Sequence, residues 1–276
     1  MTVLALASAK GSPGVTTTSL ALALVWPHPI LLVEHDPAGG DLLAGFLAGA
    51  DPPGGGLLGL ALASRRAPLE AGHVLERTLP LDTSGNRRAL PAPADSSQWR
   101  PIAEAGDRLA DLFATVAADG SGPDVLLDAG RVGPTHGNPV FDQADLRLLV
   151  LRPTLRGASA ARSHITALKG AADASGGVGL LLVGDGAYTA REISDALGLP
   201  VLGVIANDPV SAAVLAGERV AGRGFDRSPL IRSARSLSHE LLRHLSAPDS
   251  GTAHSAVGPV AAETVATVQV PAGRSG

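Results

Sequence analysis

Residues 3–24 read VLALASAKGSPGVTTTSLALAL, and this stretch decides the fold of the chain. The apolar run 3–7 predicts a buried strand, residues 8–14 a glycine-containing loop, and the threonines at 16–18 the start of a helix. Such a turn forms a phosphate cradle, because loop N–H groups and the helix dipole both face the anion. The loop nevertheless departs twice from the P-loop pattern GxxxxGK[ST], since Ala9 replaces the first glycine and Val15 replaces the lysine.

Apolar strands alternate with helices along the rest of the chain. Strands are predicted at residues 30–34, 124–128, 146–151, 178–183 and 201–205, with shorter candidates at 74–81 and 88–91. Helices are predicted at residues 16–26, 42–48, 57–63, 101–118, 158–168, 189–197, 210–216 and 237–245. This alternation predicts an α/β fold with a mostly parallel, twisted sheet covered by helices on both faces. Residues 1–246 are the predicted domain, and residues 247–276 are predicted to be a disordered tail because they lack periodicity.

Composition excludes several classes of protein. The 276 residues carry a net charge of −4, so no global positive field draws the chain to nucleic acid or to an anionic membrane. The absence of cysteine excludes disulfides, thiolate catalysis and cysteine-ligated metal, and it is compatible with a cytoplasmic protein. The sequence has neither an apolar run of about 18 residues nor an export signal at its start, so no membrane helix is expected.

Three candidate features fall at the carboxyl ends of predicted strands, where open α/β sheets bind ligands. They are the loop 9–17, Asp36 and Asp128. Nucleotide hydrolysis needs such a set: loop N–H groups hold phosphates, a hydroxyl such as Thr16 ligates Mg²⁺, and one acid holds the metal while another positions water. Each feature alone also fits an ordinary role, as a βα turn, a residue before Pro37 or a cap. Their order and spacing together favour a nucleotide site.

The motifs resemble those of the ParA/MinD family of deviant Walker ATPases, which position chromosomes, plasmids, division sites and other cargo. The family loop KGGxGKTT corresponds to KGSPGVTT at residues 10–17, and the second motif, DxDPQG, corresponds to EHDPAG at residues 34–39. An apolar strand ending in DxxxG corresponds to LLDAG at residues 126–130. The run LGLPVLGVIAND at residues 197–208 resembles the closing strand and the IPxD segment. The resemblance covers residues 1–246 and implies a three-layer P-loop NTPase fold.

The resemblance implies a set of functional residues. Lys10 corresponds to the signature lysine, which reaches across an ATP-dependent homodimer to the partner's phosphates, and Asp36 and Asp128 complete the catalytic set. Thr16 and Asp128 are the implied Mg²⁺ ligands, partly through water. The residues implied to contact ATP are Lys10, Gly11, Ser12, Gly14, Val15, Thr16, Thr17 and Asp208. A cargo-adaptor protein that stimulates hydrolysis is the implied activating partner.

The departures from the family pattern leave two hypotheses open. Val15 replaces the lysine that holds the β- and γ-phosphates of its own subunit, which removes a charge-assisted contact worth on the order of 1.5–3 kcal/mol. Pro13 also removes one loop N–H donor. Either Lys10 of the partner supplies the missing charge and hydrolysis is weak, or hydrolysis is lost. In the second case the protein is a non-catalytic localisation or assembly scaffold, like the degenerate ParA-like proteins of pilus systems.

A cluster of arginines near the C-terminus of the predicted domain supports a third hypothesis. Six arginines lie between residues 219 and 243, and ParA-like proteins hold DNA nonspecifically through basic residues. Arg219, Arg223 and Arg243 are the candidates for sequence-independent, salt-sensitive phosphate contacts. The competing interpretation is a solvated surface, because 20 of the 22 basic residues in this chain are Arg. The third hypothesis is a nonspecific DNA-binding, nucleoid-associated protein with a vestigial nucleotide site.

Overall fold

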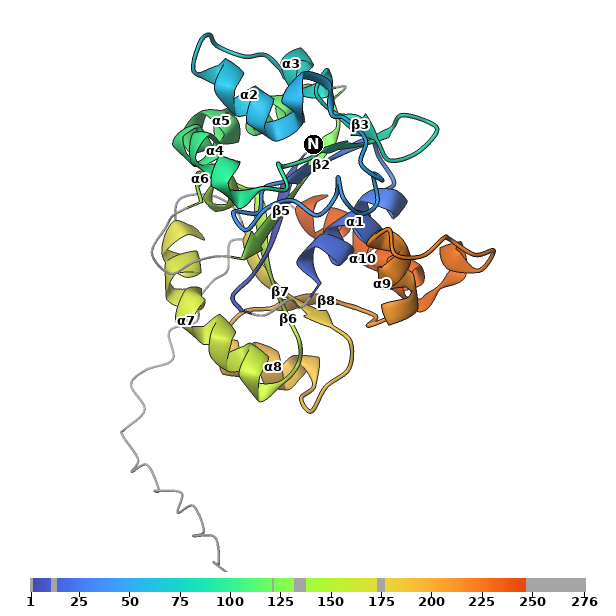
Figure 1. Cartoon of the computed structure of the whole chain (residues 1–276). Helices are drawn as coiled ribbons and strands as arrows, with labels where there is room; N and C mark the ends of the chain where they lie inside the picture. The colour runs from blue at the N-terminus through green and yellow to red at the C-terminus, as the bar shows by residue number, and fades with distance from the viewer. Residues whose placement is uncertain (1, 11–13, 121, 132–137, 173–176, 247–276) are drawn as a thin grey trace, which may run out of the picture. The chain divides into compact units, whose positions relative to one another are not determined.

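A single sheet organises the chain. The computed structural model describes residues 2–10, 14–120, 122–131, 138–172 and 177–246. Within these ranges eight strands pair in the order β3-β4-β2-β5-β1-β6-β7-β8 (Figure 1), and every neighbouring pair is parallel except β3 and β4. The strands are β1 (Val3–Ser8), β2 (Ile30–Glu34), β3 (Leu79–Pro80), β4 (Arg87–Leu90), β5 (Asp124–Arg131), β6 (Leu146–Leu151), β7 (Gly177–Val183) and β8 (Val201–Ile205).

The helices connect these strands. The α-helices are α1 (Val15–Val25), α2 (Gly56–Ser64), α3 (Ala71–Leu75), α4 (Arg100–Glu104), α5 (Gly106–Ala118), α6 (Pro139–Asp142), α7 (Leu155–Ala172), α8 (Ala190–Leu197), α9 (Pro209–Leu215) and α10 (Pro229–Ser246). Short 3₁₀ turns are η1 (Pro53–Gly55), η2 (Ser96–Trp99) and η3 (Phe225–Arg227). None of the helices in the described ranges is both long enough and apolar enough to span a bilayer.

Two apolar cores lie on the two faces of the sheet. Side chains alternate along each strand, so Leu4 and Leu6 of β1 enter one core, and Val3, Ala5 and Ala7 enter the other. The first core is closed by α1, α9 and α10, and the second by the helices α2 to α8. The predicted three-layer α/β architecture is therefore confirmed.

The order of the strands brings the candidate residues together at the carboxyl ends of the central strands. The central strand β1 pairs with β5 on one side and with β6 on the other. On the far side of β5 lies β2, with Glu34 opposite Asp128. The loop after β1 and the carboxyl ends of β2 and β5 therefore lie on the same side of the sheet, because parallel strands all end on that side.

Two segments between β2 and β4 differ from the expectation. Residues 42–48 form consecutive turns instead of the predicted helix. Their hydrogen bonds span three to six residues and not a regular four, as in Ala48 N–H to Gly45 O and Gly49 N–H to Leu43 O. Of the predicted strand 74–81, the first part belongs to α3, and only Leu79–Pro80 pairs as β3.

Helix boundaries also differ in the second half of the chain. The predicted helix 101–118 is two helices, because the chain breaks at Ala105 (φ −95°, ψ 0°) before Gly106. The last helix begins at Pro229 and not at residue 237, since Leu230, Ile231 and Ala234 extend its buried stripe. The short helix α6 was not predicted. The predicted tail, residues 247–276, lies outside the described residues.

Candidate functional site

The loop after β1 ends on the first turn of α1. Gly14 is the N-cap of α1 and has φ 97°, a left-handed conformation that glycine adopts without steric cost. Its carbonyl accepts the Thr18 N–H at 2.8 Å. Lys10 is exposed at the start of the loop. The predicted contact residues Gly11 and Ser12, and Pro13 with them, lie outside the described residues.

Val15 is the first residue of α1 and points into the protein. Its side chain is only 6% exposed and belongs to the core closed by α1, α9 and α10. An apolar residue in this place completes the packing under the helix start but offers no charge to a phosphate. Val15, in the position of the family's lysine, therefore serves as a core residue.

Asp128 is a fully buried acid near the carboxyl end of β5. Its Oδ1 accepts the Gly130 N–H at 3.1 Å, whereas its Oδ2 is buried and has no hydrogen-bond partner among the described residues. Burial raises the pKa of Asp128 to about 6, and the Thr16 hydroxyl and the Gly130 N–H oppose this effect. A buried carboxylate oxygen without a partner is costly unless a proton or a cation satisfies it.

The surroundings of this oxygen fit Mg²⁺. A carboxylate and a threonine hydroxyl are hard oxygen ligands, and Mg²⁺ sites beside phosphates use one or two protein ligands and several waters. No group of three or more acidic, histidine or cysteine side chains in the described part of the chain is arranged so that it could hold a metal ion. The ion would therefore rely on Thr16 and Asp128, completed by water and the phosphates.

Asp36 lies next to Asp128, across the end of β5. Its carboxyl packs against Gly130, whose φ of +57° and missing Cβ leave room for it. Asp36 Oδ1 accepts the Ala38 N–H at 2.8 Å, and burial raises the pKa of this half-buried acid. The structure thus brings Thr16, Asp36 and Asp128 together.

Glu34 is a site residue that sequence reasoning treated only as part of a motif. Its Oε1 accepts the Asp41 and Leu42 N–H groups at 2.7 and 2.9 Å, and its Oε2 accepts the Ala92 N–H at 2.9 Å. Burial raises the pKa of Glu34 to about 7 despite these donors. Glu34 therefore fastens the segment that follows Asp36 to the chain beyond β4.

His35 is a second buried polar residue next to Asp36. Its ring meets Trp99 edge-on at 4.7 Å between centroids, and its Nδ1 lies 3.3 Å from the Asn138 side-chain nitrogen. Burial lowers the pKa of His35 to about 4, so the ring is neutral near pH 7. The only feature of the sequence that indicated a role for His35 was its position between Glu34 and Asp36; its contacts with Trp99 and Asn138 could not be predicted.

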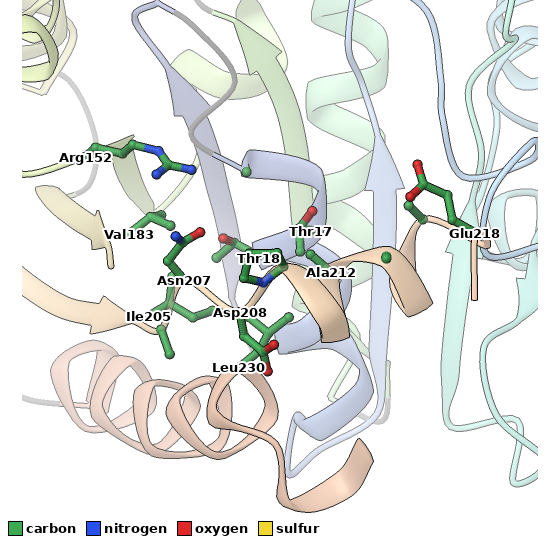
Figure 2. Close-up of a pocket in the computed structure, with 15 residues that line it drawn as sticks. Thr17, Thr18, Arg152, Val183, Ile205, Asn207, Asp208, Ala212, Glu218 and Leu230 are labelled. Carbon is green, nitrogen blue, oxygen red and sulfur yellow. The ribbon is translucent and has the colours of Figure 1, made fainter. Parts of the chain in front are cut away.

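A pocket of about 360 Å³ adjoins the first turn of α1 (Figure 2). Its floor and walls come from α1, from the ends of β6, β7 and β8, and from α9 and α10. Residues that line it include Gly14, Thr17, Thr18, Arg152, Val183, Asn207, Asp208, Glu218 and Leu230. The pocket is about the size that small-molecule sites have, and it begins at the first turn of α1.

Asp208 lines this pocket but is occupied as a helix cap. Its Oδ1 accepts the Ser211 N–H at 3.1 Å and its Oδ2 accepts the Ser211 hydroxyl at 2.7 Å. The hydrogen bonds from Ser211 hold the pKa of Asp208 below its ordinary value against the effect of burial. The neighbouring Asn207 side chain points into the pocket in Figure 2.

The three candidate DNA-binding arginines do not form one cluster. Arg219 and Arg223 are exposed in the segment between α9 and α10. Arg243 lies near the other end of α10 beside Val201, which begins β8. Because a helix rises about 1.5 Å per residue, roughly 20 Å of α10 separates its first turn from Arg243.

Comparisons with solved structures show which known proteins have a similar fold. No protein-family model matches the sequence, and no curated protein matches it. Among solved structures, a ParA family ATPase from Chlorobium tepidum has a TM-score of 0.69 at 20% identity, covering 87% of this chain and 98% of the other. The cell division ATPase MinD from Pyrococcus furiosus has a TM-score of 0.68 at 19% identity, covering 88% and 99%.

A third similar structure is that of a nucleotide complex. The septum site-determining protein MinD from Pyrococcus horikoshii, complexed with Mg-ADP, has a TM-score of 0.65 at 19% identity and covers 89% of this chain and 97% of the other. At these identities the likeness concerns the fold. The predicted ParA/MinD-like P-loop ATPase fold is confirmed.

Proposed function

We propose that the chain is an ATP-dependent dimerising switch of the ParA/MinD type that positions DNA or other cellular cargo, with weak or partner-stimulated ATP hydrolysis. The observation that carries the proposal is the buried Oδ2 of Asp128, for which the described residues offer no hydrogen-bond partner. It lies beside Thr16, at the carboxyl ends of the strands where the loop after β1 also ends. The ParA and MinD structures of the same fold, one of them with Mg-ADP, support it.

Each residue in the site has a distinct task in this proposal. The loop N–H groups and the first turn of α1 bind the phosphates, and the pocket beside Thr17 takes the nucleoside. Mg²⁺, when bound, neutralises phosphate charge. Thr16 and Asp128 would hold that ion. Asp36, held against Gly130, orients the attacking water, and Lys10 of a second subunit adds positive charge.

The test measures nucleotide binding and oligomeric size together. We expect ATP with Mg²⁺ to convert the monomer to a dimer in light scattering, whereas ADP does not. Lys10→Ala removes the charge contributed to the partner and should leave a monomer that still folds, because Lys10 is exposed. A monomer whose size and heat of mixing are unaffected by ATP would contradict the proposal.

The second candidate, a non-catalytic assembly scaffold, is favoured by the burial of Val15. The buried Val15 side chain cannot make the phosphate contact that a lysine in this position would make, so a charge used in hydrolysis is missing. A scaffold should dimerise without nucleotide and show no turnover. Phosphate release by the wild type above that of Asp36→Ala would rule the scaffold out, and equal rates would favour it.

A further inference from the structure

Arg152 is the basic side chain of the pocket. Among the described residues that line the pocket it alone carries a positive charge, and it shares the pocket with Gly14 and Thr17 of the phosphate-binding turn. Figure 2 shows the guanidinium projecting from the end of β6 toward the start of α1. Neither the P-loop pattern nor any residue assigned above accounts for it.

The sheet explains why Arg152 reaches this place. Strand β6 pairs directly with β1, with Leu149 opposite Ala7, so Arg152 emerges at the same edge as the loop that follows β1. The backbone around it is held, because the Arg152 carbonyl accepts the Thr154 N–H at 2.7 Å and the Pro153 carbonyl accepts the Tyr188 N–H at 3.4 Å. These hydrogen bonds hold the backbone from which the exposed Arg152 side chain extends.

The guanidinium is free to meet an anion. The ion pairs found among the described residues do not include Arg152. The two acids of the pocket are not competitors: Asp208 accepts both hydrogen bonds from Ser211, and Glu218 lies on the opposite side of the pocket in Figure 2. An unpaired arginine beside a phosphate-binding turn has the geometry for two parallel hydrogen bonds to phosphate oxygens.

We infer that Arg152 binds the phosphate chain of the nucleotide within its own subunit and supplies the positive charge that Val15 does not. This inference rests on the proposed function, because it assigns a further binding residue to the same site. The charge comes from the neighbouring strand instead of from the helix start. Phosphate binding is then strong before any second subunit contributes Lys10.

The test compares nucleotide affinities of Arg152 variants with a matched control. Arg152→Ala and Arg152→Gln remove the charge, and Arg156→Ala removes another exposed arginine, in the first turn of α7, which does not line the pocket. Titration calorimetry with adenosine, ADP and ATP is carried out on the monomeric Lys10→Ala background, so that dimerisation does not contribute. Thermal unfolding verifies that all variants fold equally.

We expect both Arg152 variants to bind ADP and ATP at least tenfold more weakly than the parent, because a charge-assisted phosphate contact is lost. Adenosine affinity should not change, and Arg156→Ala should behave like the parent. Affinities of Arg152→Ala within twofold of the parent would overturn the inference while leaving the proposed function intact. If the parent and the wild type bind neither ADP nor ATP, both the inference and the proposed function are refuted.

Discussion

Glu34 is, with Asp128, one of two fully buried acids beside the site. Its carboxylate is 1% exposed, and it collects three backbone N–H groups from two separate segments. Desolvation nevertheless outweighs these donors and raises its pKa to about 7. Near neutral pH, the segment that carries Asp36 is therefore anchored by a group that is partly protonated.

The raised pKa of Glu34 predicts a specific dependence of stability on pH. The folded chain retains the Glu34 proton up to about pH 7, whereas the unfolded chain loses it near 4.5. The stability from this proton is complete below pH 4.5 and is lost as the pH rises to 7. Glu34→Gln cannot titrate, so the free energy of unfolding of the variant should rise relative to the wild type by up to about 3 kcal/mol across that range.

Denaturant unfolding at several pH values between 4.5 and 7.5 measures this difference. Burial lowers the pKa of His35 to about 4, which makes stability rise with pH, but His35 is present in both proteins and its effect cancels in the comparison. Gln offers one N–H where the carboxylate accepted the Ala92 N–H, so a constant loss is also expected. Parallel profiles for the two proteins would contradict the prediction.

At the scale of elements, the end of β5 decides how the two candidate acids, Asp36 and Asp128, meet. β5 continues beyond Asp128 to Arg131, and Gly130 adopts φ +57° there. Its missing Cβ is what allows the Asp36 carboxyl to lie against the strand. The close approach of two acids therefore depends on a single glycine.

Gly130→Ala should displace Asp36 and destabilise the fold. The left-handed backbone costs an L-residue about 1–2 kcal/mol, and the new methyl group would overlap the Asp36 carboxyl. We expect a loss of about 1–3 kcal/mol in denaturant unfolding, with hydrolysis reduced to the level of Asp36→Ala.

The matched control is Gly72→Ala in α3. A Cβ at Gly72 meets no atom within 4 Å, so this variant should be neutral or stabilised by up to about 1 kcal/mol. If Gly130→Ala behaves like Gly72→Ala in both measurements, the glycine does not position Asp36.

At the scale of the molecule, the candidate DNA-binding arginines lie toward the two ends of α10. The pocket and the exposed Arg219 and Arg223 lie toward the beginning of α10, whereas Arg243 lies at its other end. Arg219 and Arg223 share the segment between α9 and α10. The three residues that the sequence grouped by proximity are therefore two separate groups.

If the chain binds DNA nonspecifically, the paired arginines should dominate. The double variant Arg219→Ala, Arg223→Ala should weaken binding to a duplex of arbitrary sequence and reduce the slope of log affinity against log salt by about two. Arg243→Ala is the matched control and should leave the slope unchanged. Fluorescence anisotropy over a range of salt concentrations measures both. A reduced slope with Arg243→Ala alone would show that this grouping is wrong.

Local patterns in the sequence were sufficient to predict the α/β architecture. Apolar runs and turn residues predict strands and helices because they act on neighbours in the chain, and β2, β6 and β8 have the predicted bounds. The position of Asp36 and Asp128 at one edge follows as well, because parallel strands end on the same side. Errors arose where packing overrides periodicity, as in residues 42–48 and at the start of α10.

The properties of the candidate site were decided by tertiary structure. Glu34 acquires its raised pKa from burial and its donors from residues up to 58 positions away, and Val15 becomes a core residue because distant elements close over it. Arg152 reaches the pocket only because β6 lies beside β1. The sequence by itself determined the fold and the motif residues, since those depend on order along the chain. Solvation and charge at the site depend on neighbours in space, and only the assembled sheet supplies them.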